Sequence, residues 1–284
     1  MSAETDRVSP AGVVLWRRQV AAMLGLELRK TFLRARALPV IAIAFLPALI
    51  LLLRAMSRRF GGEVAGQSAA QVATIYAQIF QLFFLRLVVF FGCFAIFTYL
   101  VRGEIAERSL HFYLLAPMRR SVFLAGKYLA GVLAAGALFT LSLAAQLWLA
   151  FVPEITAGGG AYLFGGPGTH QAFAYLTVVW LAVLGYGAVF LTLALVARNP
   201  MIPAAAILGW EWLNFLLPPV LKRISVIHYL QSLCPVPVSG GPFALPGEPT
   251  PAPLAAGGLL LLVAVLLTLA ARRARRLEVL YTGD

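Results

Sequence analysis

Charged residues are scarce in this sequence. They make up 12% of its 284 positions, whereas 61% are hydrophobic. Soluble domains are about 45–50% apolar and about 25% charged. A water-soluble core does not absorb so large an apolar excess, so we expect a lipid bilayer to be the solvent for much of the chain. The formal net charge is +12. Because the basic residues gather at the ends of apolar runs, they indicate contact with lipid headgroups rather than with nucleic acid.

Residues that carry chemistry are also rare. Two cysteines, Cys93 in an apolar run and Cys234 in a loop, have a spacing that fits neither a metal site nor a disulfide framework. His111, His170 and His228 lie on three different segments, and no H-E-x-x-H pattern occurs. The sequence contains no phosphate-binding P-loop and no G-x-S-x-G elbow. We therefore expect no catalytic, metal or cofactor site in this chain.

Long apolar runs are what the sequence does contain. A membrane-spanning helix needs about 20 residues, with a range of roughly 17–25. We therefore expect an all-α polytopic membrane protein with a six-span domain at 37–271, between an N-terminal region at 1–36 and a cytoplasmic tail at 272–284. The six predicted spans are 37–54, 79–101, 122–152, 172–197, 201–218 and 254–271.

The N-terminal region mixes basic and apolar residues. On a helical wheel its apolar side chains share one broad arc, which is typical of an amphipathic helix lying in the membrane interface. A basic tail that only sets orientation is the alternative. The first apolar run follows this long basic segment, so we expect a retained span rather than a cleaved signal peptide. The residues of the arc are Val20, Met23, Leu24, Leu28 and Phe32.

The basic residues predict the orientation of the spans. With six spans both termini lie on one side, and that side carries 17 of the 23 Lys and Arg residues. Only Arg54, Arg58, Arg59, Lys222 and Arg223 fall on the other side. Because an excess of Lys and Arg marks cytoplasmic loops, we expect both termini in the cytoplasm of a cell-membrane protein.

Two charged residues fall inside predicted spans. Arg86 lies about 10 Å from the outer end of the second span, and Glu211 about 15 Å from the inner end of the fifth, at 1.5 Å per residue. Charges inside a membrane are costly and usually face the bundle interior. Three interpretations remain open: an ion pair between Arg86 and Glu211, an Arg86 side chain that reaches outward alone, or a contact with a transported substrate.

Between the second and third predicted spans lies a charged segment that is expected to form a short helix. Its charged residues fall at positions i, i+3, i+4 and i+7, which is one face of a helix. A proline ends the helix, because its ring disfavours the α conformation of the residue before it. The face either meets solvent or docks a cytosolic partner. The residues concerned are Glu104, Glu107, Arg108, His111 and Pro117.

This segment resembles the region after the second span in permeases of type-2 ABC transporters. The family pattern is an acid, a hydroxyl residue before Leu, a Leu-Leu-small-Pro-x-x-Arg run, and a Lys that opens the third span. The layout of an amphipathic N-terminal helix, six spans and a semi-apolar outer segment before the last span is also similar. The matching residues are Glu104, Ser109-Leu110, Leu114-Leu115-Ala116-Pro117, Arg120 and Lys127.

The resemblance implies a membrane subunit of an exporter that pairs with a second permease chain and is driven by separate cytosolic ATPases. In that role the charged face at 104–111 is a coupling helix, with Leu114 adding apolar contact to the ATPase. ATP would then be hydrolysed in the partner, and this chain would not be an enzyme. An integral-membrane lipid-processing enzyme and a secondary transporter with internal repeats are the alternative functions.

The predicted topology can be tested by cysteine labelling. In a chain with Cys93 and Cys234 replaced by alanine, we expect Gly240→Cys to react with a membrane-impermeant maleimide added outside intact cells. Reaction only after the cytoplasmic face is opened would reverse the orientation.

Overall fold

The computed structural model describes residues 24–25, 37–60, 68–106, 120–151, 160–216, 218–222, 224–238 and 250–275. Every regular element within these ranges is a helix, which confirms the predicted all-helical class for this part of the chain. The elements are α2 (Leu38–Phe60), α3 (Ala69–Gln78), the π-helix η2 (Ile79–Val89), α4 (Phe90–Ala106), α6 (Arg120–Phe151), α7 (Gly160–Gly165), α8 (Pro167–Val196), α9 (Met201–Trp212), the 3-10 helix η5 (Leu213–Leu216), α10 (Pro219–Lys222), α11 (Val226–Ser232) and α12 (Ala252–Arg275).

Five helical segments of the described chain are long and apolar enough to cross a membrane. They correspond to five of the six predicted runs, and α12 continues through Arg273 into what was predicted to be the C-terminal tail. The chain is therefore a helical protein with several membrane-crossing segments. The five segments are Leu38–Ser57, Ala69–Gly103, Val122–Phe151, Pro167–Val196 and Ala252–Ala274.

The second segment begins ten residues before the predicted start at residue 79. Polar residues in α3 lower its hydropathy, but Gln71, Thr74 and Gln78 share one exposed face, whereas Val72 is buried. A capping box starts the helix, because the Ser68 hydroxyl accepts from the Gln71 N–H at 3.3 Å and the Gln71 side chain accepts from the Ser68 N–H at 3.0 Å.

The predicted fifth span, 201–218, is not among these segments. Its helix, α9, has only 12 residues, so it rises about 18 Å at 1.5 Å per residue, against a hydrocarbon core of about 30 Å. The chain then passes through η5 and reaches Pro218 and Pro219, which do not continue a regular helix. A sixth span is therefore not confirmed.

Two other predictions fall largely outside the described residues. The interfacial helix predicted within 1–36 is one of them, apart from residues 24 and 25. Residues 107–119, which hold most of the predicted coupling helix, are the other. Of that helix only the first residues belong to a described element, as the end of α4.

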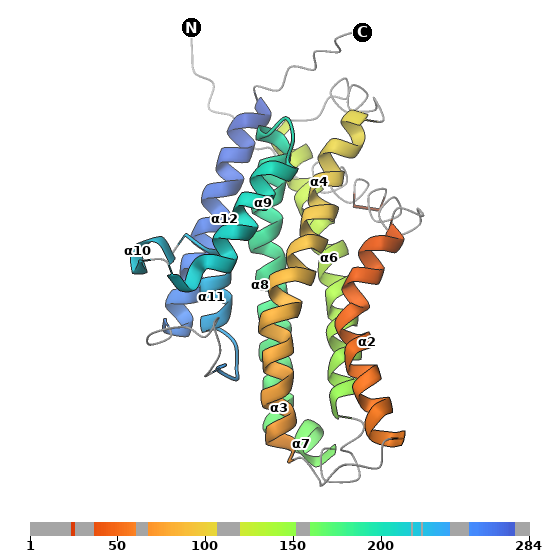
Figure 1. Ribbon diagram of the computed structural model, residues 1–284. Coiled ribbons are helices and arrows are strands. Elements are labelled where there is room, and N and C mark those ends of the chain that lie inside the picture. Colours follow the sequence, from red (N-terminus) through yellow and green to blue (C-terminus); the bar gives the residue numbers. More distant parts are fainter. Residues whose placement is uncertain are drawn as a thin grey trace, which may run out of the picture.

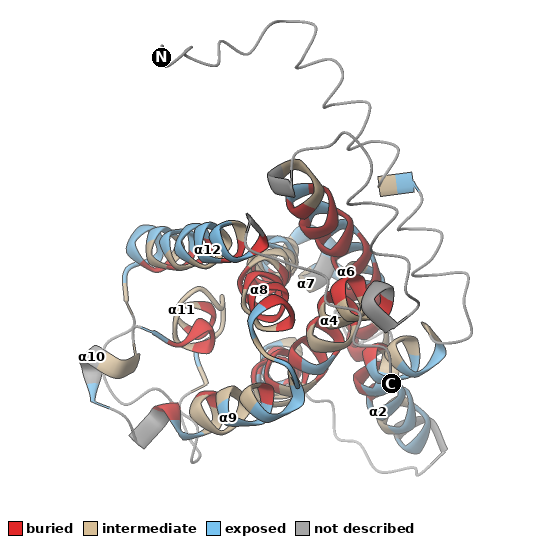
Figure 2. Cartoon of the chain, turned by 90° about the horizontal axis from the view of Figure 1, so that it is seen from above, coloured by how far each residue is buried: buried red, intermediate tan, exposed pale blue. Residues whose placement is uncertain are grey.

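The helices run alternately up and down (Figure 1). α3, η2 and α4 continue into one another as one long rod, and α8 packs along it. α6 packs against both α4 and α8, whereas α2 flanks α6 and α12 flanks α8. Seen from above, α11 lies between α8, α9 and α12 (Figure 2). The most apolar window of α8 is 72% buried, against 22% for α2 and for α12, so α8 is central and the two flanking helices face outward.

Aromatic rings packed against glycines hold α4, α6 and α8 close together. Phe97 of α4 is fully buried. A Cβ atom on Gly187 of α8 would lie 2.4 Å from its Cζ atom, and one on Gly131 of α6 would lie 2.5 Å from its Cε1 atom. Small residues let helix backbones approach closely inside a membrane, where no hydrophobic force drives helices together. The ring of Phe97 therefore occupies space that any side chain at Gly131 or Gly187 would need.

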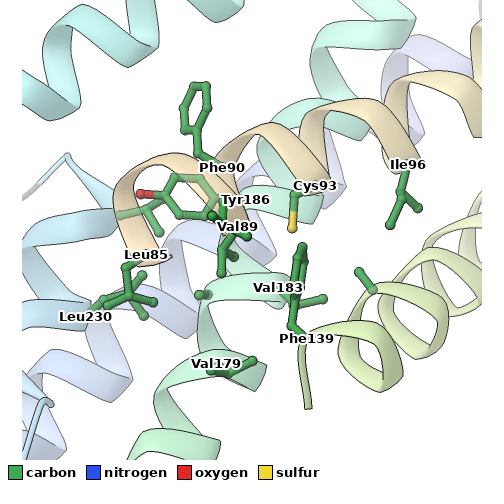
Figure 3. Close-up of a cluster of buried hydrophobic side chains, with 14 of the residues drawn as sticks. Leu85, Val89, Phe90, Cys93, Ile96, Phe139, Val179, Val183, Tyr186 and Leu230 are labelled. Carbon is green, nitrogen blue, oxygen red and sulfur yellow. The ribbon is translucent and has the colours of Figure 1, made fainter. Parts of the chain in front are cut away.

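A second part of the core lies where the rod crosses α8 and α11. Figure 3 shows Phe90 and Tyr186 side by side, with Leu230 of α11 near Leu85. The Phe90 ring centroid lies 5.4 Å from that of Tyr186 and 4.9 Å from that of Phe190, both in edge-to-face arrangements that aromatic pairs favour. This packing brings the Tyr186 hydroxyl to the polar cluster described below.

The packing of Phe97 predicts the effect of glycine substitutions. We expect Gly187→Ala to lower stability by about 1–3 kcal/mol, because the added methyl group overlaps the Phe97 ring. Gly209→Ala is the matched control, since a Cβ atom at Gly209 meets nothing within 4 Å, and alanine favours a helix interior by about 1 kcal/mol. The measurement is the midpoint of thermal unfolding in detergent micelles. Equal midpoints for the two variants would contradict the predicted overlap.

Candidate functional site

A buried carboxylate is the centre of the most extensive polar cluster in the described residues. Glu211 lies in the last turn of α9 with 4% of its surface exposed. Its Oε2 atom accepts hydrogen bonds from the Ser225 hydroxyl at 3.0 Å, the Ile227 N–H at 2.9 Å and the Tyr186 hydroxyl at 3.3 Å. Its Oε1 atom accepts from the Val226 N–H at 3.0 Å. The carboxylate thus has four donors, all supplied by this chain.

The position of the carboxylate follows from how α11 begins. The first N–H groups of a helix have no partner within the helix and need an acceptor. Ser225 stands at the cap position of α11, but its side chain makes no capping hydrogen bond. The Glu211 carboxylate caps the helix instead, and its negative charge meets the positive end of the helix dipole. Glu211 therefore fastens α11 to the end of α9.

Arg86 approaches Glu211 from η2. Its side chain is 3% exposed, and its Nη1 atom donates to the main-chain carbonyl of Glu211 at 2.8 Å. The carbonyls at the end of a helix lack partners within the helix, so this bond satisfies one of them. The structure brings the two charged residues of the apolar runs together. This hydrogen bond joins Arg86 to the main chain, and an ion pair between the two side chains stays a prediction.

Two buried amides extend the cluster. Asn214 Nδ2 donates to the Ser225 hydroxyl at 3.3 Å, and Gln81 Nε2 donates to the Val236 carbonyl at 2.8 Å. Sequence reasoning did not single out Gln81, Ser225 or Tyr186. Gln81 had a signal, since it is a polar residue in an apolar run. Ser225 and Tyr186 had none, because hydroxyl residues are common both at helix starts and in transmembrane helices.

The cluster is suited to holding segments together rather than to chemistry. The acceptor positions of the Glu211 carboxylate are directed at donors of the chain itself. Among the described residues no three His, Cys, Asp or Glu side chains lie close enough to hold a metal ion. The hydrogen bonds connect α8, α9 and α11 to one another and to η2, which lies far earlier in the sequence. The cluster therefore fixes the short helices α9 and α11 against α8 and the long rod.

Of the predicted coupling residues, only Glu104 belongs to a described element. Glu104 belongs to the last turn of α4, and its side chain is outside the described residues. The other predicted coupling residues lie entirely outside the described residues. They are Glu107, Arg108, His111, Leu114 and Pro117.

Two basic residues flank these positions in the described helices. Arg102 of α4 is half-buried, and its Nη2 atom donates to the carbonyl of Ala197, which follows α8. Lys127 of α6 is fully buried, with its Nζ atom 5.5 Å from the centroid of the Phe123 ring. A cation over an aromatic face is attracted to the ring. Arg102 thus joins α4 to the residue that follows α8, whereas Lys127 contacts a ring of its own helix.

The apolar helices define the class of protein, a helical membrane protein with several membrane-crossing segments. No known family model matches the chain, and no curated protein matches it. The assignment of a function therefore depends on the residues and their geometry.

The hydrogen bonds of Glu211 predict how α11 responds to substitution. We expect Ser225→Ala to lower stability by about 1–2 kcal/mol and Glu211→Leu by more, since Glu211→Leu leaves two buried N–H groups unsatisfied at about 1–3 kcal/mol each. Ser232→Ala is the matched control, because that hydroxyl bonds only to the His228 carbonyl within its own helix. Thermal unfolding in micelles measures the effect. A Glu211→Leu midpoint equal to that of Ser232→Ala would mean that the carboxylate does not hold α11.

Proposed function

We propose that this chain is the membrane-spanning permease subunit of an ATP-binding-cassette transporter, which exports a substrate while a separate cytosolic subunit hydrolyses ATP. The observation that carries the proposal is the place of residues 107–119. They connect the end of α4 to the start of α6, two helices that pack against each other and against the central helix α8. A partner that binds this connection would act on the core of the bundle.

Hydrogen bonds near this end support such a transmission of force. Arg102 joins the end of α4 to the Ala197 carbonyl in the turn between α8 and α9. The Tyr128 hydroxyl of α6 donates to the Leu184 carbonyl of α8 at 2.9 Å. The acceptors are Leu184 in α8 and Ala197 directly after it. The donors, Arg102 and Tyr128, belong to α4 and α6, which residues 107–119 connect. Displacement of either helix would therefore pull on α8.

The packing further along the bundle supports the same argument. The Phe97 ring fills the space between Gly131 and Gly187, so α4, α6 and α8 cannot slide past one another without moving the ring. Tight interiors transmit strain rather than absorbing it. Beyond this point Arg86 joins the rod to Glu211 and thus to α9 and α11. A continuous set of contacts leads from the end of α4 and the start of α6 to α9 and α11.

The partners follow from the same assignment. The charged residues Glu104, Glu107, Arg108 and His111 would set register and specificity against the ATPase, and Leu114 would add apolar contact before Pro117. A second permease chain would complete the path for the substrate. Both partners act on a multi-pass protein of the cell membrane, with its two termini in the cytoplasm.

A secondary transporter is the second candidate, because Arg86 and Glu211 are buried charges of the kind that mark ion pathways. The donors around the Glu211 carboxylate argue against it, since a transported cation would have to displace them. A lipid-processing enzyme would need a polar catalytic cluster near one membrane surface, and the described cluster serves to hold helices together. Dependence of transport on ATP separates the first candidate from these two.

The proposal predicts the effect of reversing charge in the connection. In vesicles that contain this chain and its candidate ATPase, we expect the double variant Glu104→Lys and Glu107→Lys to reduce stimulated ATP hydrolysis at least about tenfold, which corresponds to about 1.4 kcal/mol of lost interaction. The measurement is the ATPase rate of the co-purified complex.

The matched control reverses two acids that are predicted to lie on the opposite side of the membrane, Glu63→Lys and Glu154→Lys. That variant should insert normally and stimulate hydrolysis as the wild type does. Normal stimulation by a stably inserted Glu104→Lys, Glu107→Lys chain would remove the docking role.

A further inference from the structure

The middle of the α3–α4 rod is wound as a π-helix. η2 spans Ile79–Val89 and has 11 residues, with α-helix on either side. Most π-helical segments are single-turn bulges inside α-helices, and they are frequent at functional sites. An uninterrupted segment of this length needs a cause, because the surrounding sequence forms ordinary α-helix.

The two polar residues of η2 provide that cause. Gln81 and Arg86 are both buried, with 4% and 3% of their surfaces exposed. Gln81 donates to the Val236 carbonyl, just beyond α11, and Arg86 donates to the Glu211 carbonyl at the end of α9, each at 2.8 Å. Both acceptors are main-chain atoms of the stretch that contains α9 and α11. Two residues of the rod thus donate hydrogen bonds toward the side of the bundle that holds α9 and α11.

Their spacing requires the π winding. Gln81 and Arg86 are five positions apart. In an α-helix five positions rotate the side chain about 500°, so the two would point about 140° apart. In a π-helix the hydrogen bonds run from i to i+5, so residues five apart lie nearly above one another. The π winding thus brings both side chains to the stretch from Glu211 to Val236.

We propose that η2 is a register switch, held in its π form by the hydrogen bonds of Gln81 and Arg86 to the outer stretch. When those two bonds break, the segment rewinds as α-helix and turns α3 relative to α4 by at least about 100°, the rotation of one residue in an α-helix. The inference concerns the conformational states of this chain alone and does not depend on the proposed transport function.

The packing of α3 is consistent with a second orientation. Tyr76 of α3 and Tyr175 of α8 are buried with their ring centroids 5.3 Å apart. Neither hydroxyl has a hydrogen-bond partner among the described residues. A buried hydroxyl without a partner is unfavourable, so the present orientation of α3 carries an energetic cost at the Tyr76 hydroxyl. The two bonds from η2 oppose a rotation of α3.

Spin-label distances test the switch. Thr74 of α3 and Leu254 of α12 are exposed and would carry the labels as cysteines, in a chain with Cys93 and Cys234 replaced by alanine. The double variant Gln81→Leu and Arg86→Leu in lipid vesicles should shift the distance distribution. Because the side-chain envelope of a helix is about 10–12 Å wide, a rotation of about 100° moves a surface site by about 8 Å. Gln78→Leu, at an exposed position of α3, is the control and should leave the distribution unchanged.

Deletion of one residue provides a second, independent test. Deleting Leu82 places Gln81 and the arginine four positions apart, so an all-α rod keeps both side chains on one face. We expect this variant to keep the wild-type label distance and to unfold within a few degrees of wild type. Deletion of Ala95 in α4, half-buried as Leu82 is, should instead displace Phe97 and lower the midpoint strongly.

The outcomes decide the proposal in each case. An unchanged distance distribution in the Gln81→Leu, Arg86→Leu variant would overturn it. If that variant does not fold, the deletions decide alone: a Leu82 deletion as damaging as the Ala95 deletion would show that η2 is not set by the spacing of its two polar residues.

Discussion

The capping of α11 by the Glu211 carboxylate is the interaction on which the positions of α9 and α11 depend. Val226 and Ile227 at the start of α11 are buried away from solvent, so the chain must supply the acceptor for their N–H groups itself. Glu211 does so for Val226 and Ile227, while its own main-chain carbonyl receives Arg86. One residue therefore joins α9, the short helix α11 that follows it, and the long rod. The buried charge is retained because its hydrogen bonds are complete.

The inner part of the bundle is held together by a different principle. Helices in lipid gain little from burying apolar surface, so close contact between backbones becomes the main source of attraction. Gly131 and Gly187 provide it by leaving room for the Phe97 ring. The result is a compact set of three helices, α4, α6 and α8, and the proposed coupling connection joins the first two of them along the chain. Force applied at that connection would move the three together, whereas α2 and α12 at the flanks have fewer buried residues to resist displacement.

These two principles meet at η2. The rod packs tightly against α8 on one side, and on the other it donates hydrogen bonds to main-chain carbonyls of the stretch from Glu211 to Val236. An α-helix allows only one of these sets of contacts, because Gln81 and Arg86 are spaced for a different winding. The π-helix allows both sets of contacts, and the departure from α-helical winding is confined to η2. If the chain is a permease, this segment lies on the path between the coupling connection and the outer helices.

The sequence by itself determined that the protein is helical and membrane-spanning. Long apolar runs are stable only in a lipid environment, and there the backbone has to form helices to satisfy its own hydrogen bonds. The sequence also marked Arg86 and Glu211, since charges within apolar runs are conspicuous. It did not show that α9 gives way to a 3-10 helix at Leu213, because hydropathy rates Leu213 and Phe215 alike whether they continue a helix or end it. Tertiary structure alone decided that Glu211 caps α11 and accepts hydrogen bonds from Ser225 and Tyr186, and that η2 is a π-helix. Both depend on contacts between residues far apart in the chain, and local periodicity carries no information about such partners.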